Sequence, residues 1–309
     1  MVKMSSGSSC LGIQDVLNET TRLLKNGNIE SPRLDAELLL AKALSCDKID
    51  LYIDQDLDMD EHSNTILSEL VNKRLNHMPI QYILGHTEFM SLDFAVDENV
   101  LIPRPETELI VETVLEIVNN ETNDITDNID IIDLCTGSGN IGVSIAVLLR
   151  NANVYSCDIS NDALTVARVN AKKHKVDDRT IFLQGDIFDA FEAKHIDLKA
   201  DFIVSNPPYV AEYEWDSLQP EIYRHEPYQA LVGGNDGFDF HRRIIAEAKN
   251  WLKDNGYLIL EIGDKQLNGV IELINSSQNE NNCNCPDFEF LNTVKDLQGI
   301  DRVVVAKRM

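Results

Sequence analysis

The chain has 309 residues, 43% of them hydrophobic, which is enough for about two domains with buried cores. Its 52 acidic and 27 basic side chains give a formal net charge of −25, which argues against binding bare nucleic acid, because that affinity rests on Lys and Arg neutralising phosphate. No stretch approaches the roughly 20 apolar residues that a membrane span needs, so no membrane association is expected.

The N-terminal part of the chain is predicted to be helical. Residues 1–10 are Ser-rich with one basic side chain, unlike a secretory signal or an Arg-rich transit peptide, so a frayed end is expected. The expected helices run from Ile13 to Leu24, from the N-cap Ser31 and Pro32 to about Ser45, and from about Asp60 to His77. Because these helices carry no obvious chemistry, we interpret residues 1–78 as a small helical substrate-binding domain.

Residues 79–104 are predicted to link the two domains through a β-hairpin. Gln81–Leu84 and Phe89–Val96 alternate apolar and polar residues around Gly85-His86. The following stretch Leu101–Glu108 holds Arg104 between two prolines and leads into a helix over about 106–118. Two interpretations of this stretch stay open: Pro105 is simply the first helical residue, or the segment is a lid over a cofactor site.

From residue 105 to 309 the chain alternates strands with helices. Apolar strands are expected to end near Cys135, Asp158, Gln184 and Ser205, with amphipathic helices between them. This alternation predicts an α/β domain with a doubly wound, mostly parallel sheet, whose carboxyl edge binds ligands. Closing strands are expected over 256–263, 288–294 and 302–306. The long polar segment 210–239 is expected to be functional, since long loops are uncommon inside compact domains.

The cysteines and histidines do not predict a metal site. The six cysteines are scattered, which is typical of a reduced compartment, and a cytoplasmic protein is expected. Cys283-x-Cys285 lies in the Asn-rich stretch 276–286, which is expected to be a disordered loop. The seven histidines show no metal-type spacing and are expected at solvated or capping positions.

A glycine turn follows the first of these strands. Asp133-Leu-Cys-Thr-Gly137-Ser-Gly139-Asn-Ile-Gly142 reads as strand, tight turn and helix start, where free backbone amides face a ligand. Asp158, at the end of the next strand, has about the spacing at which a carboxylate receives ribose hydroxyls. A nicotinamide oxidoreductase and an S-adenosylmethionine methyltransferase both fit this pattern.

The stretch Asn206-Pro207-Pro208-Tyr209 separates these two classes. Prolines end the strand, because they have no amide hydrogen to continue a ladder. The Asn206 amide oxygen and the Pro207 carbonyl can each accept a hydrogen bond from an NH2 group, while Tyr209 covers its face. This tip has no acid or base for hydride transfer, so it favours methyl transfer to a planar nitrogen over an ordinary turn.

Together these motifs resemble class I S-adenosylmethionine methyltransferases that modify planar nitrogens. The flanking motifs look like the protein-(glutamine-N5) methyltransferases that act on peptide chain release factors. They are Pro79-Ile-Gln-Tyr-Ile-Leu-Gly85, Leu101-Ile-Pro-Arg-Pro-Glu-Thr-Glu108, Glu226-Pro227, Ala230-Leu231 with Gly233-Gly234 and Asp236-Gly237, Leu260-Glu-Ile-Gly263, and Asp296-Leu-x-Gly-x-Asp-Arg302. The resemblance runs from about Ser31 to the C-terminus.

The resemblance implies a seven-stranded sheet, S-adenosyl-L-methionine as cofactor, and the glutamine of a Gly-Gly-Gln loop in a release factor as substrate. It implies catalytic roles for Asn206, Pro207 and Tyr209, with Pro208 also holding the substrate amide. For the cofactor it implies Cys135, Thr136, Gly137, Ser138 and Gly139 at the amino-acid end, Asp158 at the ribose, Asp186 and Ile187 at the adenine, and Asn206 nearby. Cys135 departs from the pattern, because many relatives have glycine there.

Three alternatives remain beside this expectation. A sibling enzyme that methylates a glutamine in a ribosomal protein shares the general pattern. A DNA adenine-N6 methyltransferase shares Asn-Pro-Pro-Tyr, but it needs a basic channel, which the net charge of −25 opposes. A cofactor-binding protein without turnover has no reason to keep the complete motif at Asn206–Tyr209.

Overall fold

The computed structural model describes residues 12–53, 58–121, 128–276 and 287–309. The expected frayed N-terminus and the Asn-rich stretch with Cys283-x-Cys285 lie outside the described residues. The chain divides into two compact units. One consists of the chain up to His86 together with Gln219–His225, and the other consists of Thr87–Leu218 and Glu226–Met309. No helix among the described residues is long and apolar enough to span a bilayer.

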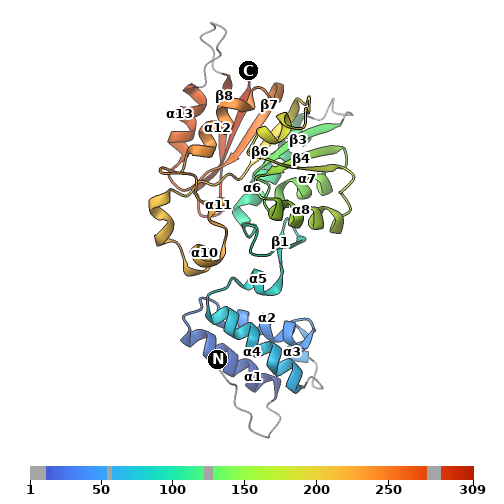
Figure 1. Ribbon diagram of the computed structural model, residues 1–309, viewed down its shortest axis with the longest axis vertical. Coiled ribbons are helices and arrows are strands. Elements are labelled where there is room, and N and C mark those ends of the chain that lie inside the picture. The colour runs from blue at the N-terminus through green and yellow to red at the C-terminus, as the bar shows by residue number, and fades with distance from the viewer. Residues whose placement is uncertain (1–11, 54–57, 122–127, 277–286) are drawn as a thin grey trace. The chain divides into compact units, whose positions relative to one another are not determined.

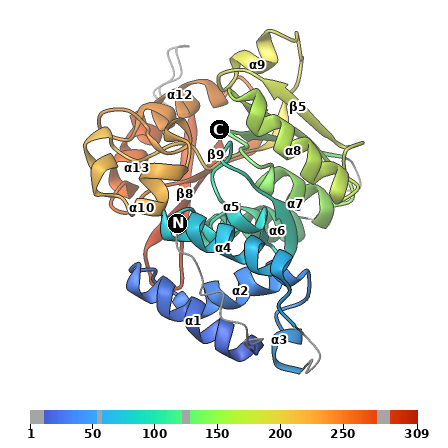
Figure 2. The ribbon, with the colours of Figure 1, turned by 60° about the horizontal axis from the view of Figure 1, so that its bottom comes forward.

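The first unit is helical. Its helices are α1 (Ile13–Asn26), α2 (Pro32–Leu44), α3 (Asp50–Ile53), α4 (Glu61–Leu75), α5 (Ile80–Leu84) and α10 (Pro220–His225). Figure 2 shows α1, α2 and α4 side by side, and they bury a common core that includes Leu17, Leu39 and Leu67. The predicted helices are confirmed. Pro32 begins α2 as expected, but the Ser31 hydroxyl makes no capping bond, whereas Asp60 caps α4 by accepting from the Ser63 amide at 2.7 Å.

A segment from the middle of the long loop packs within this helical unit. Arg74 is buried, and its guanidinium binds Asp35 at 2.7 Å and Glu221 of α10 at 3.2 Å. The His225 ring also contacts the backbone carbonyl of Asn76 at 3.0 Å. The segment 210–239 is therefore not one continuous irregular loop, because Gln219–His225 at its centre belongs to the helical unit.

The predicted hairpin is partly wrong. Ile80–Leu84 forms the short helix α5, which ends where Gly85 adopts φ +84°. The hairpin consists of β1 (His86–Phe89) and β2 (Leu92–Ala95), joined through Met90 and Ser91. Both turn residues have positive φ, at 52° and 58°. Neither residue is a usual choice for such a turn, so the sequence carried no signal for it.

The second unit contains the seven-stranded sheet, in the order β5-β4-β3-β6-β7-β9-β8, and this prediction is confirmed. The pairs among β5, β4, β3, β6 and β7 are parallel, and β9 is antiparallel to both β7 and β8. The strands are β3 (Ile129–Leu134), β4 (Ala152–Asp158), β5 (Thr180–Gln184), β6 (Ala200–Ser205), β7 (Leu252–Glu261), β8 (Phe288–Lys295) and β9 (Asp301–Arg308).

Helices cover both faces of the sheet (Figure 1). One core joins the sheet to α6 (Glu108–Glu121), α7 (Asn140–Leu148) and α8 (Asn161–Lys173). The opposite core joins it to α9 (Asp189–Glu192), α12 (Asp239–Ala248) and α13 (Leu267–Ser276). Short helical turns η1 (Pro105–Thr107), η2 (Glu212–Ser217) and α11 (Tyr228–Leu231) lie in the connections. Because β3, β4, β5 and β6 are neighbours and parallel, their carboxyl ends share one edge.

Candidate active site

A cavity of about 330 Å³ lies at the carboxyl edge of the sheet. It is lined from the ends of β3, β4, β5 and β6, from the segment before η1 and from part of the long segment 210–239. The sequence marked the last two segments only in general terms, as a possible lid and as a functional loop. The predicted residues that line it are Cys135, Gly137, Asp158, Asp186, Ile187, Asn206 and Pro208; the unassigned ones include Asn99, Val100, Leu101, Pro227, Tyr228, Gln229, Ala230 and Arg243. Thr136, Ser138, Gly139, Pro207 and Tyr209 are not among the residues that line it.

Asp133 holds the glycine turn from beneath. It is fully buried at the end of β3, and its Oδ2 accepts hydrogen bonds from the Thr136 hydroxyl, the Gly142 amide at 3.2 Å and the Ser156 hydroxyl at 3.3 Å. Burial nevertheless raises its pKa to about 7. A Cβ at Gly142 would lie 2.8 Å from Asp133 Oδ2, so this glycine lets the helix start against the carboxylate. Thr136 thus supports the turn instead of facing the cavity.

Cys135 begins the turn in an unfavourable backbone conformation for its type. Its φ is +57°, in the left-handed region that favours glycine. A glycine, which the resemblance leads one to expect here, would adopt this φ without strain. Burial raises the pKa of the Cys135 thiol, so the side chain lines the cavity as a neutral thiol.

Asp158 connects the second strand end to the turn. Its Oδ2 accepts from the Gly137 amide at 2.9 Å, and its Oδ1 accepts from the Ser160 amide at 2.9 Å. Burial raises the pKa of Asp158 although both bonds favour the charged form. The carboxylate is therefore held rigidly at the cavity wall.

Asp186 and Ile187 follow β5. Ile187 is buried with φ +49° and lines the cavity. Both Asp186 carboxylate oxygens bind the Arg243 guanidinium of α12, at 3.1 and 2.8 Å. Arg243 also lines the cavity, so this end of the site presents a paired charge and not a bare carboxylate. Sequence reasoning missed Arg243, because nothing in its neighbourhood marks it.

Asn206 emerges from β6 and is held from two distant segments. Its Nδ2 donates to the Thr107 hydroxyl at 3.1 Å, and that hydroxyl donates to Glu261 Oε2 at 2.6 Å. The Tyr209 hydroxyl donates to the other Glu261 oxygen at 3.2 Å. Glu261 is buried at the end of β7, and burial raises its pKa to about 7.

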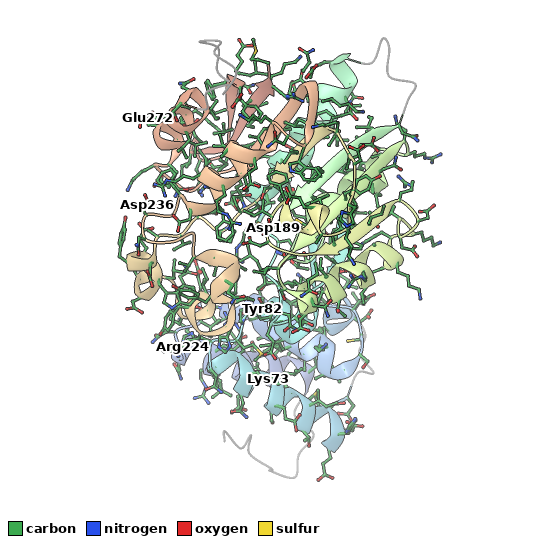
Figure 3. All side chains as sticks on the ribbon, turned by 45° about the horizontal axis from the view of Figure 1, so that its top comes forward. Lys73, Tyr82, Asp189, Arg224, Asp236 and Glu272 are labelled. Carbon is green, nitrogen blue, oxygen red and sulfur yellow. The ribbon has the colours of Figure 1, made fainter. Side chains whose placement is uncertain are left out.

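The glycine-rich loop Gly233–Gly237 packs directly on the backbone of the Asn206–Tyr209 motif. A Cβ at Gly233 would lie 2.4 Å from the Pro208 carbonyl oxygen, and one at Gly237 would lie 2.3 Å from that of Tyr209. Gln266 donates to the same Tyr209 oxygen at 3.0 Å. Asp236, labelled in Figure 3, stabilises the loop by binding the Arg242 guanidinium and the Phe238 amide.

The histidine prediction is wrong at one position. His241 is fully buried on α12, and its Nε2 lies 2.9 Å from the Glu261 backbone oxygen. Desolvation lowers its pKa, so it stays neutral as part of the support for β7. Within the described ranges no three His, Cys, Asp or Glu side chains gather as a metal site.

Known proteins share both units of this chain. The model of the PrmC N-terminal domain matches residues 15–85, and a methyltransferase domain model matches residues 125–303. The release factor glutamine methyltransferase of Clostridium botulinum is 37% identical over 96% of this chain and 99% of its own length. That of Clostridium acetobutylicum is 39% identical over 96% of this chain and 98% of its own. The chain belongs to the release factor glutamine methyltransferase family.

Solved structures extend the likeness at the level of the fold. The hMettl16 catalytic domain, in complex with the MAT2A 3′UTR hairpin 6, has a TM-score of 0.54 over 77% of this chain and 81% of that one, with 14% identity. The N-terminal domain of human METTL16, in complex with SAH, has a TM-score of 0.50 over 69% of this chain and 74% of that one, with 15% identity. These values show a shared methyltransferase fold.

Membership in the release factor glutamine methyltransferase family gives the flanking motifs a structural meaning. Glu261 of Leu260-Glu-Ile-Gly263 and Thr107 of Pro-Glu-Thr-Glu hold Asn206 and Tyr209. Glu226 of Glu-Pro is buried and binds Arg104 at 2.6 Å. Pro105 begins the turn η1 as one interpretation expected, while residues 99–101 before it line the cavity.

Proposed function

We infer that this chain transfers a methyl group from S-adenosyl-L-methionine to the side-chain amide nitrogen, N5, of the glutamine in the Gly-Gly-Gln loop of a peptide chain release factor. The observation that carries the inference is membership in the release factor glutamine methyltransferase family over nearly the whole chain. The site agrees with it, because Asn206 and Pro208 line the same cavity as Asp158 and Asp186. We place the reaction in the cytoplasm, as the cysteine usage suggests.

The cavity fits the proposed cofactor. Its volume of about 330 Å³ lies in the range of about 300–1,000 Å³ that small-molecule sites have. Carboxylates at Asp158 and Asp186 suit ribose hydroxyls and an adenine edge, and the Gly137 turn leaves room for close backbone approach. When bound, S-adenosylmethionine supplies an electrophilic sulfonium methyl group. Cys135, Gly137 and Ile187 complete the cavity lining that we assign to the cofactor, with Asn206 adjoining it. Thr136, Ser138 and Gly139, which the resemblance also assigned to the cofactor, are not part of that lining, and we assign them to the support of the turn.

The residues of the motif prepare the glutamine nitrogen for transfer. An amide nitrogen is a poor nucleophile, because its lone pair is shared with its carbonyl. Hydrogen bonds from the substrate NH2 to Asn206 Oδ1 and the Pro207 carbonyl would orient the amide and raise the electron density on nitrogen. Pro208 and Tyr209 would hold the amide plane, so that alignment with the methyl group does most of the work and no strong base acts before attack.

The substrate assignment is tested with labelled S-adenosylmethionine and two release factors, one natural and one with the loop Gln changed to Ala. We expect label in the natural factor only. Equal labelling of both factors would contradict the assignment, and labelling of a ribosomal protein or of DNA in its place would favour the alternatives. A ribosomal protein mixture and duplex DNA therefore belong in parallel reactions.

Asp158→Ala is expected to weaken cofactor affinity about 10- to 100-fold, because hydrogen bonds to a charged group are worth about 1.5–3 kcal/mol. Calorimetry with S-adenosylhomocysteine measures the change. Asp162→Ala is the matched control, since Asp162 is an exposed acid at the start of α8 close by in the chain. If both variants bind with wild-type affinity, Asp158 does not receive the ribose. Asp158→Ala also removes the hydrogen bonds to the Gly137 and Ser160 amides. A thermal melting curve of the variant shows whether that loss lowers the stability of the fold.

A further inference from the structure

Thr107 stands between the motif asparagine and a buried carboxylate. Its hydroxyl oxygen lies 3.1 Å from Asn206 Nδ2 and 2.6 Å from Glu261 Oε2. Thr107 is 1% exposed and Glu261 is 2% exposed, so water does not compete for these bonds. Tyr209 occupies the second carboxylate oxygen at 3.2 Å.

The direction of these bonds follows from counting protons. An ionised carboxylate only accepts hydrogen bonds, and a hydroxyl has one proton to donate. The hydroxyl protons of Thr107 and Tyr209 therefore both point to Glu261. The remaining lone pairs of the Thr107 oxygen can then receive only a donor, which Asn206 supplies through Nδ2. The oxygen and the NH2 of an asparagine have nearly the same shape, so hydrogen bonding decides which way the amide faces.

We propose that Glu261, acting through the Thr107 hydroxyl, selects the orientation of the Asn206 amide that leaves Oδ1 as the acceptor for the substrate NH2. Glu261 and Thr107 are then positioning residues, and Asn206 alone of the three touches the substrate. The proposal rests on the proposed function, because only an NH2 substrate requires an acceptor there. With the opposite orientation, the Asn206 NH2 would face the substrate NH2, and two donors would meet.

Protonation of Glu261 reverses the direction of the two hydrogen bonds that join it through Thr107 to Asn206. A neutral carboxyl can donate to Thr107, which then donates to Asn206 Oδ1 and turns the amide around. Burial raises the pKa of Glu261 to about 7, so this reversal falls within the ordinary assay range. The surrounding groups are Glu106 of η1, which raises that pKa, Arg302 of β9, which lowers it, Tyr209, and His241 of α12 at the Glu261 carbonyl. We call the hydrogen bonds from Asn206 through Thr107 to Glu261 the relay. Turnover that depends on the relay is present above about pH 7, where Glu261 is ionised, and is lost as the pH falls.

Thr107→Val tests the relay, because it keeps the shape of the side chain and removes the hydroxyl. We expect kcat to fall on the order of 10- to 100-fold, with the KM for the release factor and the cofactor affinity changed by less than about threefold. Thr107→Ser retains the hydroxyl and should stay within about threefold of wild-type kcat. Thr113→Val is the matched control, since Thr113 is a buried threonine on α6 whose hydroxyl donates only to the Leu109 carbonyl.

The outcomes distinguish an effect on the relay from a loss of packing, and they test the relay separately from the proposed function. Wild-type methylation of the release factor tests the function alone, and the ratio of variant to wild type tests the relay. Wild-type kcat in Thr107→Val, or equal losses in the Val and Ser variants, would overturn it. If Thr107→Val does not fold, the pH profile of kcat at saturating cofactor decides. It should fall below about pH 7 in the wild type and be flat in Glu261→Gln, and an unchanged profile in that variant overturns the relay.

Discussion

Replacing Asn206 by Ala is expected to lower kcat by about 10²- to 10³-fold, while the affinity for S-adenosylhomocysteine changes by less than about fivefold. The amide is the side-chain acceptor that the motif offers to the glutamine NH2, so its loss removes alignment and polarisation together. Cofactor affinity survives, because Asp158, Asp186 and the glycine turn line the cavity independently of β6. Single-turnover methylation and calorimetry measure the two quantities separately.

Asn153→Ala is the matched control for that experiment. Asn153 lies near the start of β4, at the opposite edge of the sheet from the cavity, and its amide donates to Asp130 at 3.1 Å. It loses a hydrogen bond of the same kind without touching the site, so its kcat should equal that of the wild type. Undiminished turnover in Asn206→Ala would refute the role proposed for the amide, and a parallel loss in both variants would point to stability.

Gly237→Ala is also expected to have a large effect, with kcat reduced at least about tenfold. Gly237 has φ +79°, and its new Cβ would lie 2.3 Å from the Tyr209 carbonyl oxygen, which Gln266 already holds. Backbone cannot move aside as a flexible side chain can, so Tyr209 must shift. The left-handed conformation adds about 1–2 kcal/mol of strain. Thermal melting and kcat with a release factor measure both parts.

Gly299→Ala is the control that separates the backbone strain of a positive φ from the steric contact of the new Cβ. Gly299 has nearly the same φ, +81°, but nothing lies within 4 Å of its Cβ position in the turn between β8 and β9. It should lose about 1–2 kcal/mol of stability and keep wild-type kcat. Equal kcat in the two glycine variants would show that the glycine-rich loop does not position Tyr209.

Parts of the fold with strong local patterns were predictable. A strand ending near Gln184 was expected and is β5, because a short apolar run that follows an amphipathic helix favours a buried strand. The predicted hairpin is present, but Gln81–Leu84, expected as one of its strands, is helical, because four alternating residues are too few to exclude a helical turn. The turn at Met90 and Ser91 could not be predicted, because neither residue is a glycine or asparagine, the types that favour positive φ.

In the candidate site, too, residues with a local sequence signal were predictable and residues placed only by the fold were not. Asp158 and Asn206 were predicted to lie together, and both line one cavity, because parallel strands bring their carboxyl ends to one edge of the sheet. Arg243 was not found, because it is an ordinary helix residue until the fold pairs it with Asp186. Thr136 was placed at the cofactor by resemblance, yet its hydroxyl binds Asp133 behind the cavity wall.

The sequence by itself determined the parallel sheet, the glycine turn and the Asn-Pro-Pro-Tyr tip, since each depends on neighbouring residues or on a short period. Only the tertiary structure decided what holds that tip. Asn206 meets Thr107 across 99 residues of chain, and Thr107 meets Glu261 across 154. No local rule links positions so far apart. They meet because β6 and β7 are adjacent and parallel, and η1 supplies the hydroxyl between Asn206 and Glu261.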